Sequence, residues 1–222
     1  MKPPAEPDLS GFWSRNVWLY GLRVPFSLMF LSWITFSQAL SPYFSLERYI
    51  LLLAASFFGL VVGAHYIDIA TSRVKFAPYF RIPYRGLLFV GVSSVLVGVL
   101  LGIYIAVNWD LPYLLAFVAV EGFAAIAYPR EKPKVAHSYP SFGITWGSLP
   151  VLASYYVQAD SVSVLALGVA VFAGIMVVVM HHLSIMTRES PDWKNCLLLF
   201  NLYKYSIYTL GLFSLVALLF RP

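Results

Sequence analysis

The stretch Gly63-Ala64-His65-Tyr66-Ile67-Asp68-Ile69-Ala70-Thr71-Ser72-Arg73 marks the point where a long apolar run becomes polar. His65 and Asp68 are three residues apart, so on a helix both side chains lie on the same face. Ionisable groups at the end of a membrane helix are costly there and indicate a functional site by default. We therefore take His65 and Asp68 as the first candidate site. The alternative is a packing histidine beside an interfacial carboxylate that pairs with Arg73 or Lys75.

A second polar cluster ends a later apolar run in the same way. It comprises His181, His182, Arg188, Glu189 and Asp192. Adjacent residues on a helix point about 100° apart, so one of the two histidines faces a given partner. If the two clusters face each other, their side chains supply the nitrogen and oxygen ligands that suit a transition metal. The predicted metal ligands are His65, Asp68, His181 and His182.

The composition indicates a helical membrane protein. Of the 222 residues, 60% are hydrophobic and 11% are charged, whereas a soluble domain has about 25% charged residues. The apolar runs are about 20 residues long and continuous, which favours membrane helices over the alternating pattern of a β-barrel. The net charge of +5 comes from short clusters between these runs, so we expect lipid as a partner and no nucleic acid.

The apolar runs predict an all-α bundle of seven transmembrane helices. We expect residues 1–14 to form a polar, Pro-rich leader and residues 15–222 to form a single transmembrane domain. The predicted helices span about residues 22–40, 48–70, 86–107, 111–128, 142–157, 162–184 and 196–220. Pro150 predicts a kink in the fifth helix, because proline removes a backbone donor and clashes one turn back.

Glycine pairs in two of these helices predict close packing. Gly59 and Gly63 in the second helix, and Gly98 and Gly102 in the third, form small-residue faces that let another helix approach.

The basic residues predict the orientation of the bundle. Between the predicted helices, one set of alternate loops holds a single cation, Arg48. The N-terminal segment and the other loops hold Lys2, Arg15, Arg73, Lys75, Arg81, Arg85, Arg130, Lys132, Lys134, Arg188 and Lys194. This bias places the N-terminus in the cytoplasm and the C-terminus outside, so both polar clusters face the cytoplasm.

One carboxylate lies within an apolar run. Glu121 falls inside the fourth predicted helix, where an acid must be paired, neutral or directed into a cavity. A partner such as Arg130 or a neighbouring helix, and a catalytic role, are the alternatives for it.

Taken in order, these features resemble the UbiA-type intramembrane prenyltransferases. In that family Asp-rich motifs end helices 2 and 6, a Tyr-Pro basic segment joins helices 4 and 5, and a Gly-x-x-Pro pattern opens onto helix 5. The corresponding segments here are Arg23 with Pro25 at the start of helix 1, residues 65–72, residues 128–132, Gly147 with Pro150, and residues 181–189. The two motif positions retain one carboxylate each, Asp68 and Glu189, and seven helices stand where the family has nine.

The resemblance implies transfer of a prenyl group from a prenyl diphosphate to a lipid-soluble acceptor. It implies Mg²⁺ as cofactor, a metal that prefers oxygen ligands. The implied catalytic residues are Asp68, His65 and Glu189, and the implied diphosphate ligands are Arg73, Lys75, Arg130, Lys132 and Arg188.

Two alternatives to catalysis remain. Because most acids of the motifs are absent, the chain is also read as an inactive membrane subunit of a larger complex, packing through its small-residue faces. The third reading is a metal or haem protein, since haem can take two axial histidines.

Overall fold

The computed structural model describes residues 22–71, 83–128, 138–190 and 192–221, apart from the side chains of Arg188 and Glu189. All regular structure in these ranges is helical, which confirms the predicted all-α class. The helical segments are α3 (Val24–Ala39), α4 (Leu46–Ser56), η1 (Phe57–Ala64), α5 (His65–Thr71), α6 (Tyr84–Asn108), α7 (Leu114–Ala127), α8 (Tyr139–Gly143), η4 (Ile144–Ser148), α9 (Leu149–Ala159), α10 (Val164–Glu189) and α11 (Trp193–Leu219). Because α4, η1 and α5 are continuous, as are α8, η4 and α9, the described segments form seven rods.

Four of these rods are long and apolar enough to cross a membrane. They are the α4–η1–α5 rod at Leu46–Thr71, α6, α10 at Val164–Thr187, and α11. Each has at least 24 residues, so at 1.5 Å per residue each exceeds the hydrocarbon thickness of about 30 Å. The helices α3 and α7 are apolar but shorter, at 16 and 14 residues. The four long rods indicate a membrane protein, as the composition predicts.

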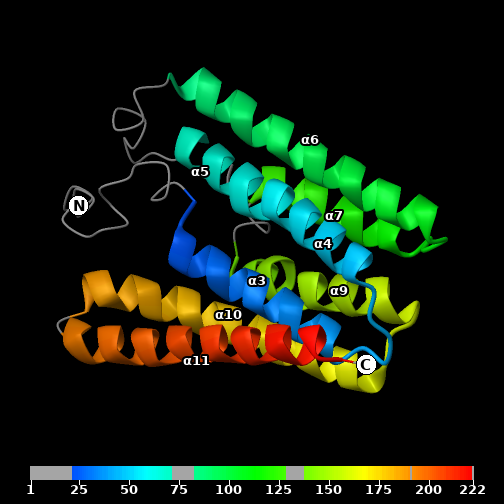
Figure 1. Cartoon of the computed structure of the whole chain (residues 1–222). Helices are drawn as coiled ribbons and strands as arrows, with labels where there is room; N and C mark the ends of the chain where they lie inside the picture. The colour runs from blue at the N-terminus through cyan, green and yellow to red at the C-terminus, as the bar shows by residue number, and fades with distance from the viewer. Residues whose placement is uncertain (1–21, 72–82, 129–137, 191, 222) are drawn as a thin grey trace.

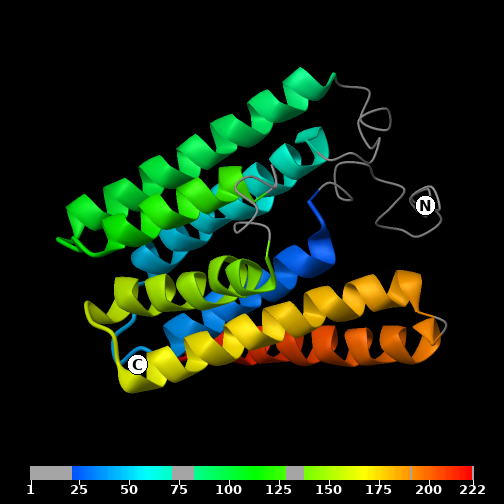
Figure 2. The same ribbon diagram turned by 180° about the vertical axis from the view of Figure 1, so that it is seen from behind.

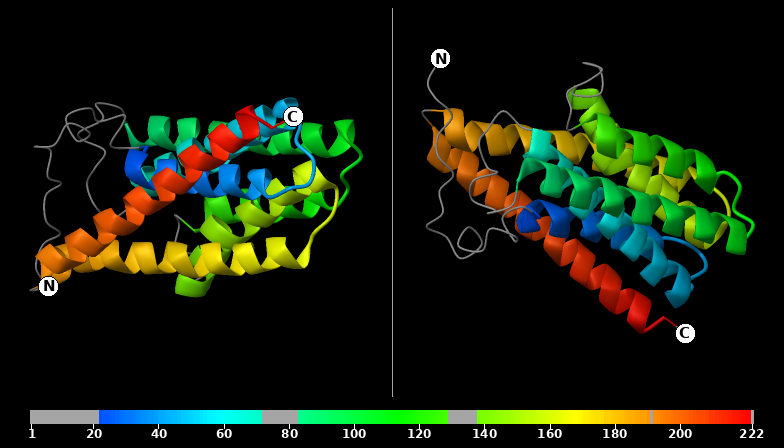
Figure 3. Two further views of the ribbon diagram at one scale, coloured as in Figure 1. Left: turned by 60° about the horizontal axis from the view of Figure 1, so that its bottom comes forward. Right: turned by 90° about the horizontal axis from the view of Figure 1, so that it is seen from above.

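The rods form two groups that meet along α9. One group consists of α4–η1–α5, α6 and α7, and the other of α3, α8–η4–α9, α10 and α11 (Figure 1). Seen from behind, α9 lies between α7 and α10 (Figure 2). The last helix, α11, crosses its group obliquely and packs on α3 and α10 (Figure 3).

Glycines set the distance between the α4–η1–α5 rod and α6. A Cβ atom added to Gly98 would lie 2.7 Å from the Cα of Gly59 and 2.7 Å from the carbonyl oxygen of Ala55. A Cβ added to Gly91 would lie 2.9 Å from the backbone nitrogen of Ile67. The predicted close approach is therefore confirmed, and the two helices meet backbone to backbone.

The glycine faces predicted to pack against other subunits contact helices of the same chain. Gly59 and Gly63 contact α6 within the chain, and Gly98 contacts the α4–η1 segment. Gly102 faces α7, where an added Cβ would lie 2.5 Å from Cγ2 of Val118. Gly63, Gly98 and Gly102 leave no room for a Cβ atom, so their small size lets helices of the same chain pack closely.

A π-helical turn precedes Pro150, in the helix where the sequence predicts a kink. The helix widens over η4 before α9 continues through Pro150 in its first turn, where proline is tolerated. Gly147 in this turn packs on α10, since an added Cβ would lie 2.7 Å from the Cα of Gly174. Ser148 Oγ donates a 2.9 Å hydrogen bond to the carbonyl of Ala170 on the same helix.

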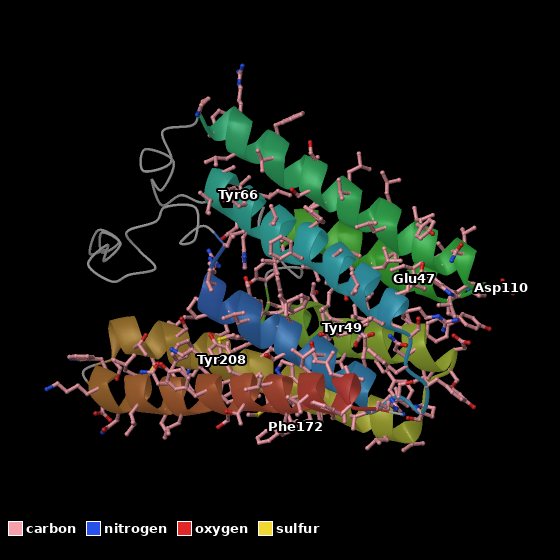
Figure 4. All side chains as sticks on the ribbon, viewed as in Figure 1. Glu47, Tyr49, Tyr66, Asp110, Phe172 and Tyr208 are labelled. Atoms are coloured by element: carbon pink, nitrogen blue, oxygen red, sulfur yellow. The ribbon has the colours of Figure 1, made fainter. Side chains whose placement is uncertain are left out.

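Polar side chains also join α3 to its neighbours. Gln158 Nε2 donates to Oε1 of Gln38 at 2.6 Å, and both side chains are buried. The hydroxyls of Thr35 on α3 and Tyr49 on α4 lie 3.1 Å apart (Figure 4). Tyr208 on α11 points toward α3 and donates to the carbonyl of Pro25 at 2.7 Å (Figure 4). Such bonds hold helices together where apolar contact alone gives little preference between protein and lipid.

A pair of glycine variants tests this packing. Gly98→Ala places a methyl group against backbone atoms, so we expect it to lower the free energy of unfolding by about 1–3 kcal/mol. Gly168→Ala on α10 is the matched control, because an added Cβ there meets nothing within 4 Å. The thermal midpoint in detergent should fall for Gly98→Ala and stay level or rise for Gly168→Ala. Equal midpoints for the two variants would contradict the close contact.

Candidate functional site

An ion pair joins the start of α3 to α5. Arg23 Nη2 donates a hydrogen bond to Oδ2 of Asp68. The Arg23 side chain is 51% exposed and the Asp68 side chain 23% exposed, so the pair lies at the edge of the bundle. The partner that the described residues provide for Asp68 is Arg23, from a rod distant in sequence. The partners predicted from the sequence, Arg73 and Lys75, lie outside the described residues.

The backbone of Arg23 has a left-handed conformation. Its φ of 46° and ψ of 50° lie in a region that non-glycine residues seldom adopt. Its carbonyl accepts the backbone N–H groups of Phe26 and Ser27 at 2.8 and 3.1 Å, which begins α3. The chain therefore turns sharply at Arg23, and this turn brings the guanidinium to α5.

His65 lies three residues before Asp68 on α5 and is buried among aromatic rings. Its side chain is 3% exposed. The imidazole stacks on Trp146 of η4 with centroids 5.5 Å apart and planes 10° apart. Phe26 contacts both rings edge-on, with centroids 5.8 Å from His65 and 5.3 Å from Trp146. His65 is thus a packed side chain between α3 and η4.

The second histidine cluster contacts the other side of the same aromatic group. His181 of α10 packs on Phe142 of α8, with centroids 4.4 Å apart. Phe142 in turn contacts Phe26 at 6.0 Å and Trp146 at 6.2 Å. His182 is exposed and lies 6.2 Å from the Tyr139 ring. The three rings of Phe26, Phe142 and Trp146, called here the aromatic layer, therefore join His65 to His181 through a series of ring contacts.

The described residues can be compared with the ligands that a metal requires. Among the described residues, Asp68 is the carboxylate that shares α5 with His65. Its Oδ2 atom is bound by Arg23. Within the described ranges, no three His, Cys, Asp or Glu residues gather closely enough to hold an ion. Mg²⁺ binds oxygen ligands in octahedral geometry, so the described residues do not by themselves fit it.

Several predicted ligands lie outside the described residues. They are Arg73, Lys75, Arg130 and Lys132, together with the side chains of Arg188 and Glu189. Their roles remain predictions. The end of α5 and the end of α10 lie toward the same end of the bundle as the start of α3 (Figure 1).

Glu121 lies in a second and separate environment. It faces a cavity of about 70 Å³ where α4, η1, α6, α7 and α9 meet. Its Oε1 atom is buried and has no hydrogen-bond partner among the described residues, while the residue as a whole is half-buried. The sequence predicts that Glu121 is paired, neutral or directed into a cavity, and the structure shows that it lines a cavity. The predicted partner Arg130 lies outside the described residues.

The role of Trp146 and Phe142 was not predicted from the sequence. These residues are four positions apart and occupy one face of the α8–η4 segment, where both contact Phe26. The spacing was a usable signal, since aromatic residues at positions i and i+4 share a helix face. Which histidines they contact depends on the packing of three separate rods.

A scan against protein-family models and searches of curated proteins and of solved structures found no match to this chain. The resemblance to the UbiA-type enzymes therefore rests on the order and spacing of the residues given above.

A double-mutant cycle on Arg23→Gln and Asp68→Asn tests the ion pair. Because both side chains are partly exposed, we expect a coupling in unfolding free energy of about 0.2–1 kcal/mol. The free energy of unfolding in detergent is measured for the wild type, the two single variants and the double variant. A coupling of several kcal/mol would contradict a solvent-screened pair, and strictly additive effects would contradict the contact itself.

Proposed function

We propose that this chain is a polytopic membrane protein with seven transmembrane helices, an N-terminus in the cytoplasm and a C-terminus outside. Seven rods in the described ranges support the count. The concentration of Lys and Arg in alternate connecting segments supports the orientation. In this orientation Arg23 and Asp68 face the cytoplasm.

We propose further that the end of the bundle that carries the Arg23–Asp68 ion pair, called here the Arg23 end, binds a prenyl diphosphate or a similar amphiphile. The observation that carries this proposal is a half-exposed guanidinium bound to Asp68, three residues before Phe26 of the aromatic layer, two of whose rings are buried. A guanidinium binds phosphate oxygens through fixed donors, and aromatic rings suit an apolar chain. The predicted cations Arg73, Lys75 and Arg188 belong to segments that follow α5 or end α10, which adds support.

The activity that such binding serves is transfer of the prenyl group to a lipid-soluble acceptor. When the C–O bond of a prenyl diphosphate breaks, negative charge accumulates on the departing diphosphate. Donors already directed at that charge stabilise it, and Arg23 is a described residue suited to this role. His65 is buried beside the layer and Asp68 orients Arg23.

A second candidate function is a membrane subunit without catalytic activity. It is favoured by the tight packing around the aromatic layer, where the void between Phe26, Phe30, Trp33 and Trp146 measures about 10 Å³. That space is about what one water-sized group requires. A prenyl chain at this end would have to lie along the apolar helix faces.

Binding of geranylgeranyl diphosphate to the purified protein tests the proposal. We expect binding that Arg23→Gln weakens about tenfold or more, since a charged hydrogen bond contributes roughly 1.5–3 kcal/mol. Titration with and without Mg²⁺, and of Asp68→Asn, shows whether a metal ion and this carboxylate contribute.

The opposite end of the bundle provides a matched control. Arg48 donates to Oδ1 of Asp160 at 2.7 Å, so it is another arginine in an ion pair with an aspartate. Arg48→Gln should leave the affinity unchanged. Absence of binding by the folded wild-type protein would reject the proposal, as would equal losses in the two arginine variants. Binding without turnover of a lipid acceptor would favour the non-catalytic candidate.

A further inference from the structure

The cavity at Glu121 contains one unpartnered acid in an apolar setting. Ser56 and Glu121 contribute the polar side chains to its wall, and the other lining side chains are apolar or glycine. No Lys or Arg is among the described residues that line it. A lone carboxylate ion is costly in such surroundings, whereas a neutral carboxyl group can both donate and accept one hydrogen bond.

The shape of the helices keeps this space open. Gly59, Gly98 and Gly122 border the cavity and add no side-chain volume to it. The π-helical segment η1 contributes Gly59 and Leu60, and short π-helical stretches within α-helices recur at functional sites. An added Cβ on Gly59 would have its nearest neighbour 3.8 Å away, so contact with α6 does not by itself require glycine there.

The size and polarity of the cavity restrict its occupant. One water-sized group needs roughly 10–15 Å³, so a volume of about 70 Å³ holds an oxygen and a few carbon atoms. An anionic group would be repelled by any ionised Glu121. A cationic group would require both partners of an ion pair to be desolvated, which is costly. A neutral hydroxyl or carbonyl group avoids both the repulsion and the desolvation of an ion pair.

We propose that the Glu121 cavity is a binding site for a neutral lipid-soluble alcohol or carbonyl compound. The neutral carboxyl group of Glu121, whose Oε1 is buried, donates a hydrogen bond to the oxygen of that molecule and also accepts one where the molecule is an alcohol. The apolar walls hold the adjoining carbon atoms, and the remaining chain lies toward the lipid at the exposed part of Glu121. This site is distinct from the Arg23 end and does not depend on the function proposed for that end.

Dicyclohexylcarbodiimide tests whether the carboxyl group is neutral and reachable from the lipid. The carboxyl oxygen bonds to the central carbon of the carbodiimide while the carboxyl proton moves to nitrogen. The acyl group then migrates from oxygen to nitrogen, so a stable adduct forms and nothing is released. An ionised carboxylate has no proton to supply. We expect mass spectrometry of the full chain in lipid nanodiscs to place the adduct on Glu121 and not on the ion-paired Asp68.

Two added ligands test whether the cavity recognises an oxygen. Octan-1-ol, at a mole fraction in the lipid that leaves the nanodiscs intact, should slow labelling of Glu121 several-fold. Octane at the same mole fraction has the same chain length without the hydroxyl and should leave the rate unchanged. Equal protection by both ligands, or protection by neither, would overturn the proposal.

A variant identifies the reacting residue. Glu121→Gln has nearly the same shape and should remove the adduct at this position while keeping the fold. If this variant does not fold, the comparison of octan-1-ol with octane on the wild-type protein still decides the matter. Absence of an adduct on Glu121 in folded wild-type protein would also overturn the proposal.

Discussion

The backbone contact between Gly59 and Gly98 is the constraint on which one half of this bundle depends. Lipid chains are as apolar as leucine side chains, so membrane helices gain little from apolar contact alone and need close packing. A Cβ on Gly98 would lie 2.7 Å from the Cα of Gly59, which shows how near the two backbones come. The π-helical segment η1 runs along this contact, and Gly102 extends it to α7. Where these glycines and the neighbouring helices meet, the space in front of Glu121 remains.

The other half depends on a different kind of contact. Gly147 packs on Gly174, while Gln158 and Tyr208 bind α3 through hydrogen bonds. The aromatic layer fills the space between α3, α8–η4 and α10, with His65 and His181 contacting different rings of it. Arg23 and Asp68 then join this half to the end of α5.

The two candidate sites differ in the charge that they can accommodate. At the edge of the bundle, the partial exposure of Arg23 and Asp68 lets water screen both charges. Around Glu121 the described lining holds no cation, and Ser56 is its other polar side chain, so a carboxylate ion there is costly. The chain therefore combines an ion pair at one end of the bundle with an apolar cavity around a single carboxyl group between the helices.

The sequence by itself determined the helices, because their period, length and apolarity are local properties. All seven predicted segments are helical in the structure, and the segment predicted to be irregular near Pro150 contains a π-helical turn. The sequence also indicated His65, Asp68 and Glu121, since ionisable residues are costly in apolar runs. Only the tertiary structure decided their partners. Asp68 pairs with Arg23, 45 positions away, and His65 stacks on Trp146 from another rod. Such contacts depend on how rods cross, and crossing depends on glycines and side-chain volumes in several helices at once.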